Sequence, residues 1–317
     1  MFVRTLSIAL VAVGVAACGG SDGATDTVDA TEVTGSPVAE DGDPVFTPVT
    51  NGDNAVPTTT VAEPTSTTST STSSTSTTST STTSTSTTLP IPDAPGPLDL
   101  TAPVLGLGRS AGGRPIVAER LGDVGGRRML VIGVIHGNED DGVAVVEQLR
   151  DSEIPNGVEL WVVESMNPDG QGAQDRHNGN EVDLNRNFPY NWGPIGVPGD
   201  PQYAGTEPAS EPETQAMVNF IEQLQPDVAI WYHQDLYVIN PSSGREGAVR
   251  QRYAELTGLP MGQITGGTYT GIAATWARNE LAPANGVAFI VELGPTLSPN
   301  EAATHTAAIL TIATDPL

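Results

Sequence analysis

Residues that bind metals or move protons stand at the ends of apolar runs in this chain. His136 and Glu139 form an H-x-x-E pair directly after the run 129–135, and His233 follows the run 227–232. Zinc accepts imidazole and carboxylate ligands, and a catalytic zinc site usually has three protein ligands and a water. The pair alone is a weak signal, and a lone histidine at a strand end more often makes a structural hydrogen bond. Together these residues suggest a zinc site.

A further carboxylate, Glu292, ends the apolar run 287–291. Burying a carboxylate there costs free energy unless the group is paired or functional. Beside a metal-activated water it would act as general base and then as general acid. The alternative is a charge that simply reaches solvent at the edge of the sheet.

The segment 176–188 groups two arginines, Arg176 and Arg186, with amide side chains such as Asn185, and it has neither helical nor strand periodicity. Arginine forms planar bidentate pairs with carboxylates and stabilises oxyanions. Because the domain is acidic, arginines gathered in one loop suggest an anionic ligand, although a solvated loop with surface ion pairs is the alternative. The other two histidines, His177 and His305, are not expected to be ligands.

Alternating strands and helices must position these residues. Apolar runs predict buried strands, and apolar residues at helical spacing or after capping-box signatures predict helices; the strands are expected at 129–135, 158–163, 227–232 and 287–291, and the helices at 141–149, after 210–213, at 245–256 and after 298–301. This alternation predicts an α/β fold with a mixed, mostly parallel central sheet and helices on both faces. Active sites in such sheets lie at the carboxyl ends of strands, where the two histidines and Glu292 fall.

Taken in order along the chain, these motifs resemble those of the M14 zinc carboxypeptidases. The matching pieces are 108–110, 113–116, 136–139, 167–170, Arg176, 182–188, His233 and Glu292. The resemblance covers nearly all of residues 98–317 and implies a zinc carboxypeptidase-like fold for them. It also implies one Zn²⁺ per chain, bound by His136, Glu139 and His233.

Further roles follow from the same resemblance. Glu292 would be the general base, Arg176 would polarise the scissile carbonyl, and Asn185 with Arg186 would hold the terminal carboxylate of the substrate. Tyr269 is the nearest candidate for the family's mobile tyrosine, but it falls about two residues late, so it could equally be a packed or rim aromatic.

Two positions concern specificity and ligand orientation. Ala274 stands at the family's specificity position; because it is small and uncharged, no acidic pocket for Lys- or Arg-terminated peptides is expected. Asp235, in the polar pair after His233, could orient a ligand through a hydrogen bond.

A closer resemblance is to the bacterial murein peptide amidases, M14 members that cut the γ-D-glutamyl–diaminopimelate bond. It is carried by segments 183–192, 210–216 and 225–227. The expected activity is therefore hydrolysis of a peptide or γ-glutamyl amide bond near a free carboxylate, with a peptide or murein peptide as substrate. The alternatives are an N-acyl amino acid deacylase, similar to aspartoacylase, and a non-catalytic wall-binding module that kept the zinc scaffold.

The N-terminal third of the chain predicts a targeting signal followed by a linker. Residues 1–17 are typical of a signal peptide, and 15–18 (Val-Ala-Ala-Cys) resemble a lipobox that ends at the only cysteine, Cys18. Residues 18–97 are poor in apolar side chains, and 65–88 are all Ser or Thr, which predicts a disordered stalk. We therefore expect an extracytoplasmic protein anchored to the membrane by lipid, or secreted if the lipobox is not used.

The charge of the chain excludes one class of partner. Its formal net charge is −25, and all 13 basic residues are Arg. Nucleic-acid phosphates require clustered basic residues, so no nucleic-acid partner is expected.

Overall fold

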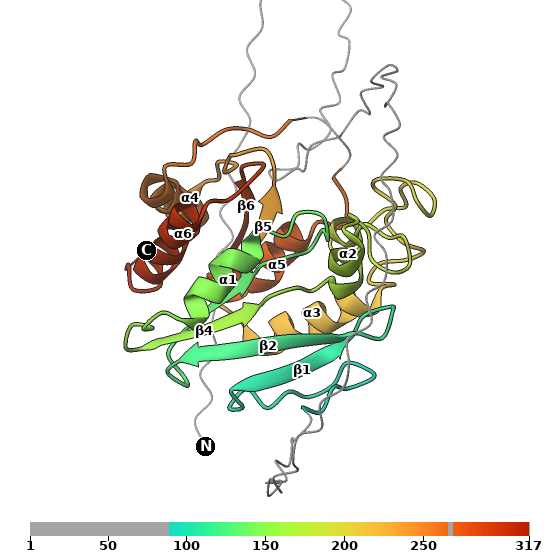
Figure 1. Cartoon of the computed structure of the whole chain (residues 1–317), viewed down its shortest axis with the longest axis horizontal. Coiled ribbons are helices and arrows are strands. Elements are labelled where there is room, and N and C mark those ends of the chain that lie inside the picture. Colours follow the sequence, from blue (N-terminus) through green and yellow to red (C-terminus); the bar gives the residue numbers. More distant parts are fainter. Residues whose placement is uncertain (1–88, 266–268, 317) are drawn as a thin grey trace, which may run out of the picture. The chain divides into compact units, whose positions relative to one another are not determined.

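The computed structural model describes residues 89–265 and 269–316. Six strands in these ranges form one sheet in the order β1-β2-β4-β3-β5-β6. Their bounds are β1 (Val104–Arg109), β2 (Pro115–Gly122), β3 (Arg127–Ile132), β4 (Val158–Val163), β5 (Val228–Gln234) and β6 (Val287–Leu293). Strands β4, β3, β5 and β6 pair in parallel, whereas β2 is antiparallel to both β1 and β4 (Figure 1). The predicted mixed, mostly parallel sheet is confirmed.

Helices cover both faces of this sheet. They are α1 (Gly142–Arg150), α2 (Pro168–Ala173), α3 (Pro212–Leu224), α4 (Gly244–Thr257), α5 (Ala273–Leu281) and α6 (Pro299–Ile312), with 3₁₀ turns at Leu184–Arg186 and Ala282–Ala284. Side chains alternate between the faces along each strand. In β5, Ala229 and Trp231 join the core cluster of α3 and α5, whereas Ile230 and Tyr232 join that of α1, α4 and α6.

The strands carry the functional residues in two different ways. His233 lies inside β5 and Glu292 inside β6, where the two are register partners. The predicted strand 129–135 ends earlier, at Ile132, and the chain then passes the β4 end closely: a Cβ on Gly133 would lie 2.6 Å from the Glu164 carbonyl oxygen. His136 therefore stands in a loop rather than directly after the strand.

One of the two predicted capping boxes is confirmed. Ser298 caps α6 and exchanges hydrogen bonds with Glu301. The box predicted at 210–213 is wrong: the N-cap of α3 is Glu211, whose side chain makes no capping bond. The Ser210 hydroxyl donates to the Glu211 carboxylate instead (2.8 Å). Strands β1 and β2 and helices α2 and α5 were not predicted as elements.

The described chain begins with a segment that lies against the domain. The Gly96 carbonyl accepts hydrogen bonds from Asn219 and Gln223 on α3, and a Cβ on Gly106 would meet the Pro90 carbonyl oxygen at 2.5 Å. The predicted signal peptide 1–17, Cys18 and most of the linker 18–97 lie outside the described residues. Within the described ranges, none of the helices combines the length and the apolar character that a bilayer crossing requires.

Candidate metal centre

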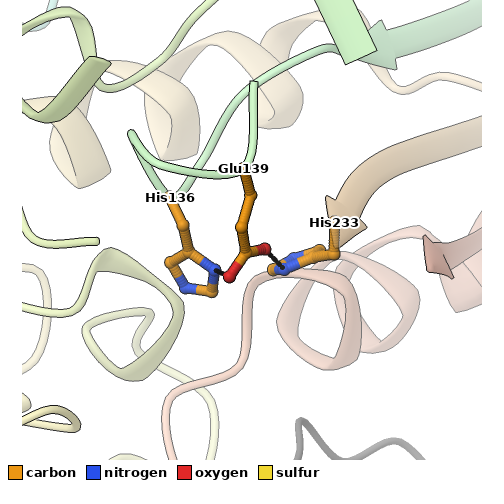
Figure 2. Close-up of side chains that lie close together, drawn as sticks. All are labelled: His136, Glu139 and His233. Carbon is orange, nitrogen blue, oxygen red and sulfur yellow. Dashed lines mark hydrogen bonds and ion pairs between the residues drawn. The ribbon is translucent and has the colours of Figure 1, made fainter. Parts of the chain in front are cut away.

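Two imidazoles and a carboxylate converge at the carboxyl end of the sheet (Figure 2). His136 and Glu139 come from the loop after β3, and His233 comes from β5; one potential ligand atom of each lies within 4.8 Å of the others. Glu139 Oε1 is 2.9 Å from His136 Nδ1, and Glu139 Oε2 is 3.1 Å from His233 Nδ1. All three side chains are buried. Nitrogen and carboxylate donors in this number fit zinc.

The loop that carries two of the ligands is fixed by close backbone packing. A Cβ on Gly137 would lie 1.9 Å from the Gly170 carbonyl carbon, so only glycine fits there. The Asn167 side chain donates to the Ile135 carbonyl (3.0 Å) and accepts from the Gly170 amide (2.9 Å). The N-terminus of α2 therefore holds the H-x-x-E loop in place.

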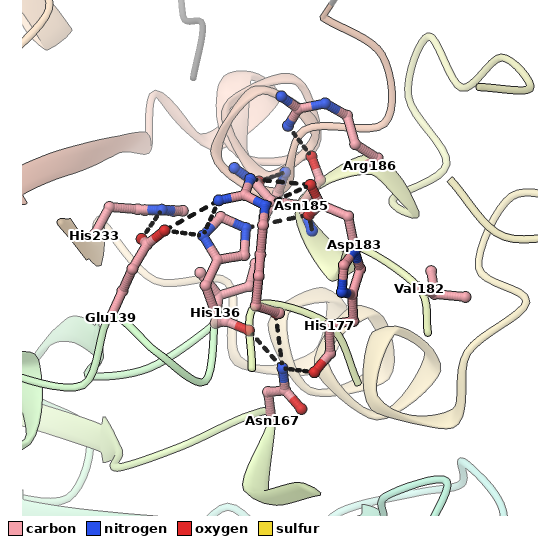
Figure 3. A network of polar contacts seen from close by, with 12 residues as sticks. His136, Glu139, Asn167, His177, Val182, Asp183, Asn185, Arg186 and His233 are labelled. Atoms are coloured by element: carbon pink, nitrogen blue, oxygen red, sulfur yellow. Dashed lines mark hydrogen bonds and ion pairs between the residues drawn. The ribbon is translucent and has the colours of Figure 1, made fainter. Parts of the chain in front are cut away.

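A second carboxylate, Asp183, contacts His136 on the ring nitrogen that points away from Glu139 and also contacts Arg176. Its Oδ1 lies 3.1 Å from His136 Nε2, and its Oδ2 accepts two hydrogen bonds from Arg176, at 3.0 Å from Nε and 2.9 Å from Nη2 (Figure 3). An ionised carboxylate only accepts, so Asp183 is placed to accept the Nε2 proton of His136, which would leave Nδ1 to bind a metal. Asp183 had no predicted role, although a carboxylate between two arginines of one loop is a signal that the sequence carries.

Opposite charges keep both carboxylates ionised. Burial raises the pKa of Asp183, but the interactions with Arg176, His136 and Arg186 outweigh it, so the pKa lies well below its usual range. Burial likewise opposes ionisation of Glu139, and the two histidines overcome it to hold that pKa well below the ordinary value. The centre is therefore prepared to receive a cation.

Arg176 reaches the centre with its remaining nitrogen. Nη1 lies 3.0 Å from Glu139 Oε1 and 3.1 Å from His136 Nδ1, while Asp183 holds the rest of the guanidinium. A fixed guanidinium beside the metal ligands can donate to an oxygen that gains negative charge.

Glu292 is placed beside His233 by strand register. The two are paired residues of neighbouring parallel strands, so their side chains leave the same face of the sheet. Glu292 is 1 % exposed and also bridges to Val238 through two backbone hydrogen bonds. Its role as a general base stays a prediction.

Asn185 and Arg186 lie in the 3₁₀ turn, and both are fully buried. Asn185 Oδ1 accepts from the Ala273 amide at the start of α5 (2.9 Å), and Arg186 Nη1 donates to the Asn185 carbonyl (2.9 Å). In Figure 3 His136 lies between Glu139 and His233 on one side and this pair on the other. Their substrate role stays a prediction.

Tyr269 is half-buried and packs against the core cluster of α3 and α5. The chain after it is pinned to the arginine loop, because the Thr270 hydroxyl donates to the Asn191 carbonyl (2.5 Å) and the Phe188 amide donates to the Gly271 carbonyl (2.9 Å). The structure brings Tyr269 to the same group of loops, and its role stays a prediction.

The two residues after His233 have roles that differ from the expectation that Asp235 orients a ligand. Gln234, rather than Asp235, supports a ligand: its backbone amide donates to Glu139 Oε2 (3.1 Å), and its side chain donates to Asp141 (3.0 Å). Asp235 is exposed and lines a cavity of about 340 Å³ beside the centre, together with Asn138, Glu139, Arg176, Gln234 and Pro295.

The other two histidines have different partners. His177 Nδ1 lies 2.8 Å from Asp175 Oδ1 at the surface of the loop. His305 is buried on α6, and its Nδ1 lies 2.7 Å from the Tyr253 hydroxyl.

Comparison with known proteins agrees with this geometry. Residues 101–256 match the family model described as zinc carboxypeptidase (peptidase M14). The murein peptide amidase A of Escherichia coli K12 is 29 % identical over 183 residues, which cover 54 % of this chain and 75 % of the relative. The carboxypeptidase SOL1 of Arabidopsis thaliana is 26 % identical and covers 47 % of this chain and 32 % of the relative.

Solved structures share the fold. The murein-tripeptide amidase of E. coli O157 superposes with a TM-score of 0.56 at 26 % identity, covering 68 % of this chain and 93 % of that one. Carboxypeptidase A of Helicoverpa armigera superposes with a TM-score of 0.57 at 19 % identity, covering 66 % and 67 %, which is a likeness of fold alone. The family resemblance and the zinc carboxypeptidase-like fold predicted from the motifs are confirmed.

Proposed function

We propose that this chain, which carries a zinc carboxypeptidase domain of the M14 family, hydrolyses a peptide or γ-glutamyl amide bond in short murein peptides. As an M14 zinc peptidase it is a hydrolase that uses Zn²⁺. The observation that carries the proposal is the register of Glu292 with His233, which itself clusters with His136 and Glu139. Binding alone would need the three ligands but neither Glu292 nor the fixed guanidinium of Arg176.

The residues divide the reaction between them. Bound zinc supplies a Lewis acid that polarises a carbonyl and lowers the pKa of water. Glu292 takes a proton from the attacking water as the new carbon–oxygen bond forms. Arg176 Nη1 donates to the carbonyl oxygen as it gains charge. Glu292 then returns the proton to the leaving nitrogen as the carbon–nitrogen bond breaks.

The substrate class is supported by the relatives and by the loop beside the centre. Two relatives bear names that state activity on murein peptides. We propose that Asn185 and Arg186 hold the carboxylate of the leaving portion, because both lie in the loop that also supplies Arg176 and Asp183. A small residue, Ala274, stands at the N-terminal end of α5 and carries no charge to select a basic leaving residue.

The test is release of diaminopimelate from a murein tripeptide by the full chain. The wild type should release it, a chelator should stop the release, and Glu292→Gln should lose about 10²- to 10⁴-fold in turnover while keeping its metal. Zinc binding without turnover on any peptide would replace the proposal by a wall-binding module. Turnover on acyl-aspartate alone would replace it by a deacylase.

We also propose that the enzyme acts outside the cytoplasm, anchored by lipid at Cys18. Support comes from the sequence pattern of residues 1–18. Cys18→Ala should move the protein from the membrane fraction to the soluble or secreted fraction of expressing cells without changing its hydrolysis of the tripeptide. Equal membrane association of both forms would contradict the anchor.

A further inference from the structure

We propose that Asp235 binds an ammonium group on the acyl side of the bond that is cut. The inference rests on the proposed function, because it takes Asn185 and Arg186 as the residues that hold the leaving portion. It adds a charge preference that neither the zinc ligands nor the general base would impose.

The direction of the substrate follows from the arrangement of the site. In Figure 3 His136 lies between Asn185 and Arg186 on one side and Glu139 and His233 on the other. The bond to be cut must lie at the metal ligands, and the leaving portion extends toward the arginine loop. The acyl portion must therefore extend the other way.

A cavity of about 340 Å³ lies on that other side. Its lining includes Glu139, Gln234 and Asp235, and also Arg176 beside the metal ligands, but neither Asn185 nor Arg186. The acyl portion of a short peptide would consequently pass the exposed carboxylate of Asp235 as it leaves the reacting carbonyl.

Of the charged groups that line this cavity, Glu139 and Arg176 already have ion-pair partners in the protein, whereas Asp235 has none within the described part of the chain. Glu139 contacts both histidines, and Arg176 pairs with Asp183 and Glu139. Among the described residues, no hydrogen bond or ion pair is found for the Asp235 carboxylate. Asp235 therefore lines the cavity without an ion-pair partner from the described ranges, whereas the charge of Arg176 is already paired, and Asp235 would attract a cationic ligand there.

The turn that carries Asp235 is held firmly at both ends. Before it, the Gln234 amide donates to Glu139 Oε2 (3.1 Å) and the Gln234 side chain donates to Asp141 (3.0 Å). After it, the Tyr237 amide donates to the Leu293 carbonyl (3.0 Å) on β6. A carboxylate at a fixed place can select a ligand by position as well as by charge.

An ammonium on the acyl portion has two sources in a peptide: the free N-terminus and the side chain of lysine. Two substrate pairs separate them. The first pair is the same cleavable murein tripeptide with a free and with an acetylated N-terminus. The second is an acetylated tripeptide in which the N-terminal residue is lysine in one member and norleucine in the other.

The experiment measures kcat/KM of the zinc-loaded full chain for both pairs. In at least one pair, the wild type should favour the cationic member about 2- to 5-fold, as expected for an exposed ion pair, with the difference in KM rather than kcat. Asp235→Asn should bring that ratio to about 1. Asp140→Asn is the matched control: it removes the same charge from the neighbouring loop, keeps an acceptor for Gln174, and should preserve the ratio.

The outcomes separate this inference from the proposed function. Cleavage of both members of each pair at equal rates would overturn the inference and leave the function standing. A preference that persists in Asp235→Asn, or that Asp140→Asn abolishes equally, would also overturn it. Cleavage of none of the peptides would overturn the proposed function and this inference with it.

Discussion

The domain buries histidines in two places, and their surroundings differ. At the carboxyl end of the sheet, His136 and His233 lie among Glu139, Arg176 and Asp183, all of which carry charge. On α6, His305 Nδ1 lies 2.7 Å from the Tyr253 hydroxyl, which in turn lies 2.6 Å from the Tyr232 hydroxyl. Burial alone therefore does not mark a functional histidine; the charge of its partners does.

The two clusters also differ in how they respond to a proton. Burial lowers the pKa of His305 to about 4, and the charge of Glu301 offsets this only in part. His305 is therefore neutral near pH 7 and serves as a hydrogen-bonding group. In the other cluster, histidines and an arginine hold the pKa values of Glu139 and Asp183 well below their usual range against the effect of burial. That cluster holds ionised carboxylates around a cation site.

The largest difference should appear when each cluster loses a histidine. His136→Ala removes a metal ligand, so we expect loss of bound zinc and turnover below detection. His305→Gln should keep one zinc per chain and the wild-type turnover. Metal analysis and tripeptide hydrolysis of both variants check this. Loss of zinc from His305→Gln, or normal turnover by His136→Ala, would contradict the view that only the cluster around His136 binds the metal.

The next largest effect is the pH dependence of stability that comes from His305 in its cluster with Tyr253 and Tyr232. A pKa that is lower in the folded than in the unfolded chain favours the folded state above about pH 6.5, and this stabilisation is lost as the pH falls toward 4. We expect His305 to account for about 3 kcal/mol of lost unfolding free energy across this window.

Denaturant unfolding of the domain at pH 7 and pH 4 measures this loss. His305→Gln keeps an acceptor for Tyr253 but does not titrate, so its unfolding free energy should fall less over the same window. An equal pH dependence in both proteins would show that His305 does not titrate as the structure indicates.

A smaller effect should follow from the orienting carboxylate of the charged cluster. Asp183→Asn keeps a hydrogen-bond acceptor for His136 but removes the charge, and we expect zinc affinity to fall about 10- to 100-fold. Competition with a chromogenic chelator measures this affinity. The unfolding midpoint of the metal-free variant should accompany the titration, because a purely structural role would lower stability and leave zinc affinity unchanged.

The smallest effect should come from the residue next to a zinc ligand in sequence. Tyr232 precedes His233, but the alternation of β5 directs its side chain to the opposite face. Tyr232→Phe removes one buried hydrogen bond and should lower the unfolding free energy by about 1 kcal/mol. Zinc content and turnover should stay at wild-type values, and a change in either would connect the two clusters.

The sequence predicted the parts of the fold that are uniform along the chain. Buried parallel strands read as largely apolar runs, and β4 begins and ends where expected although it contains Glu159. Strands β1 and β2 lie at the antiparallel edge, where glycines and charged residues interrupt the pattern, so hydrophobicity did not reveal them.

The residues that carry the chemistry of the site could be predicted from the sequence, but the residues that hold them in place could not. His136, Glu139, His233 and Glu292 come from motifs whose order along the chain is distinctive. Asp183 gains its role only when folding brings it within 3.1 Å of His136, which is 47 residues away in sequence. Gln234 supports Glu139 through its backbone amide, and a side-chain pattern carries no trace of such a contact.

Stoichiometric reconstitution with zinc tests the central claim most directly. The metal-free full chain is titrated with zinc while tripeptide hydrolysis is followed, with Glu292→Gln treated in parallel. We predict that wild-type activity rises linearly and stops rising at one zinc per chain, whereas Glu292→Gln binds the same single zinc with turnover about 10²- to 10⁴-fold lower. Hydrolysis that survives removal of zinc, saturation at another ratio, or full turnover by Glu292→Gln would contradict the account.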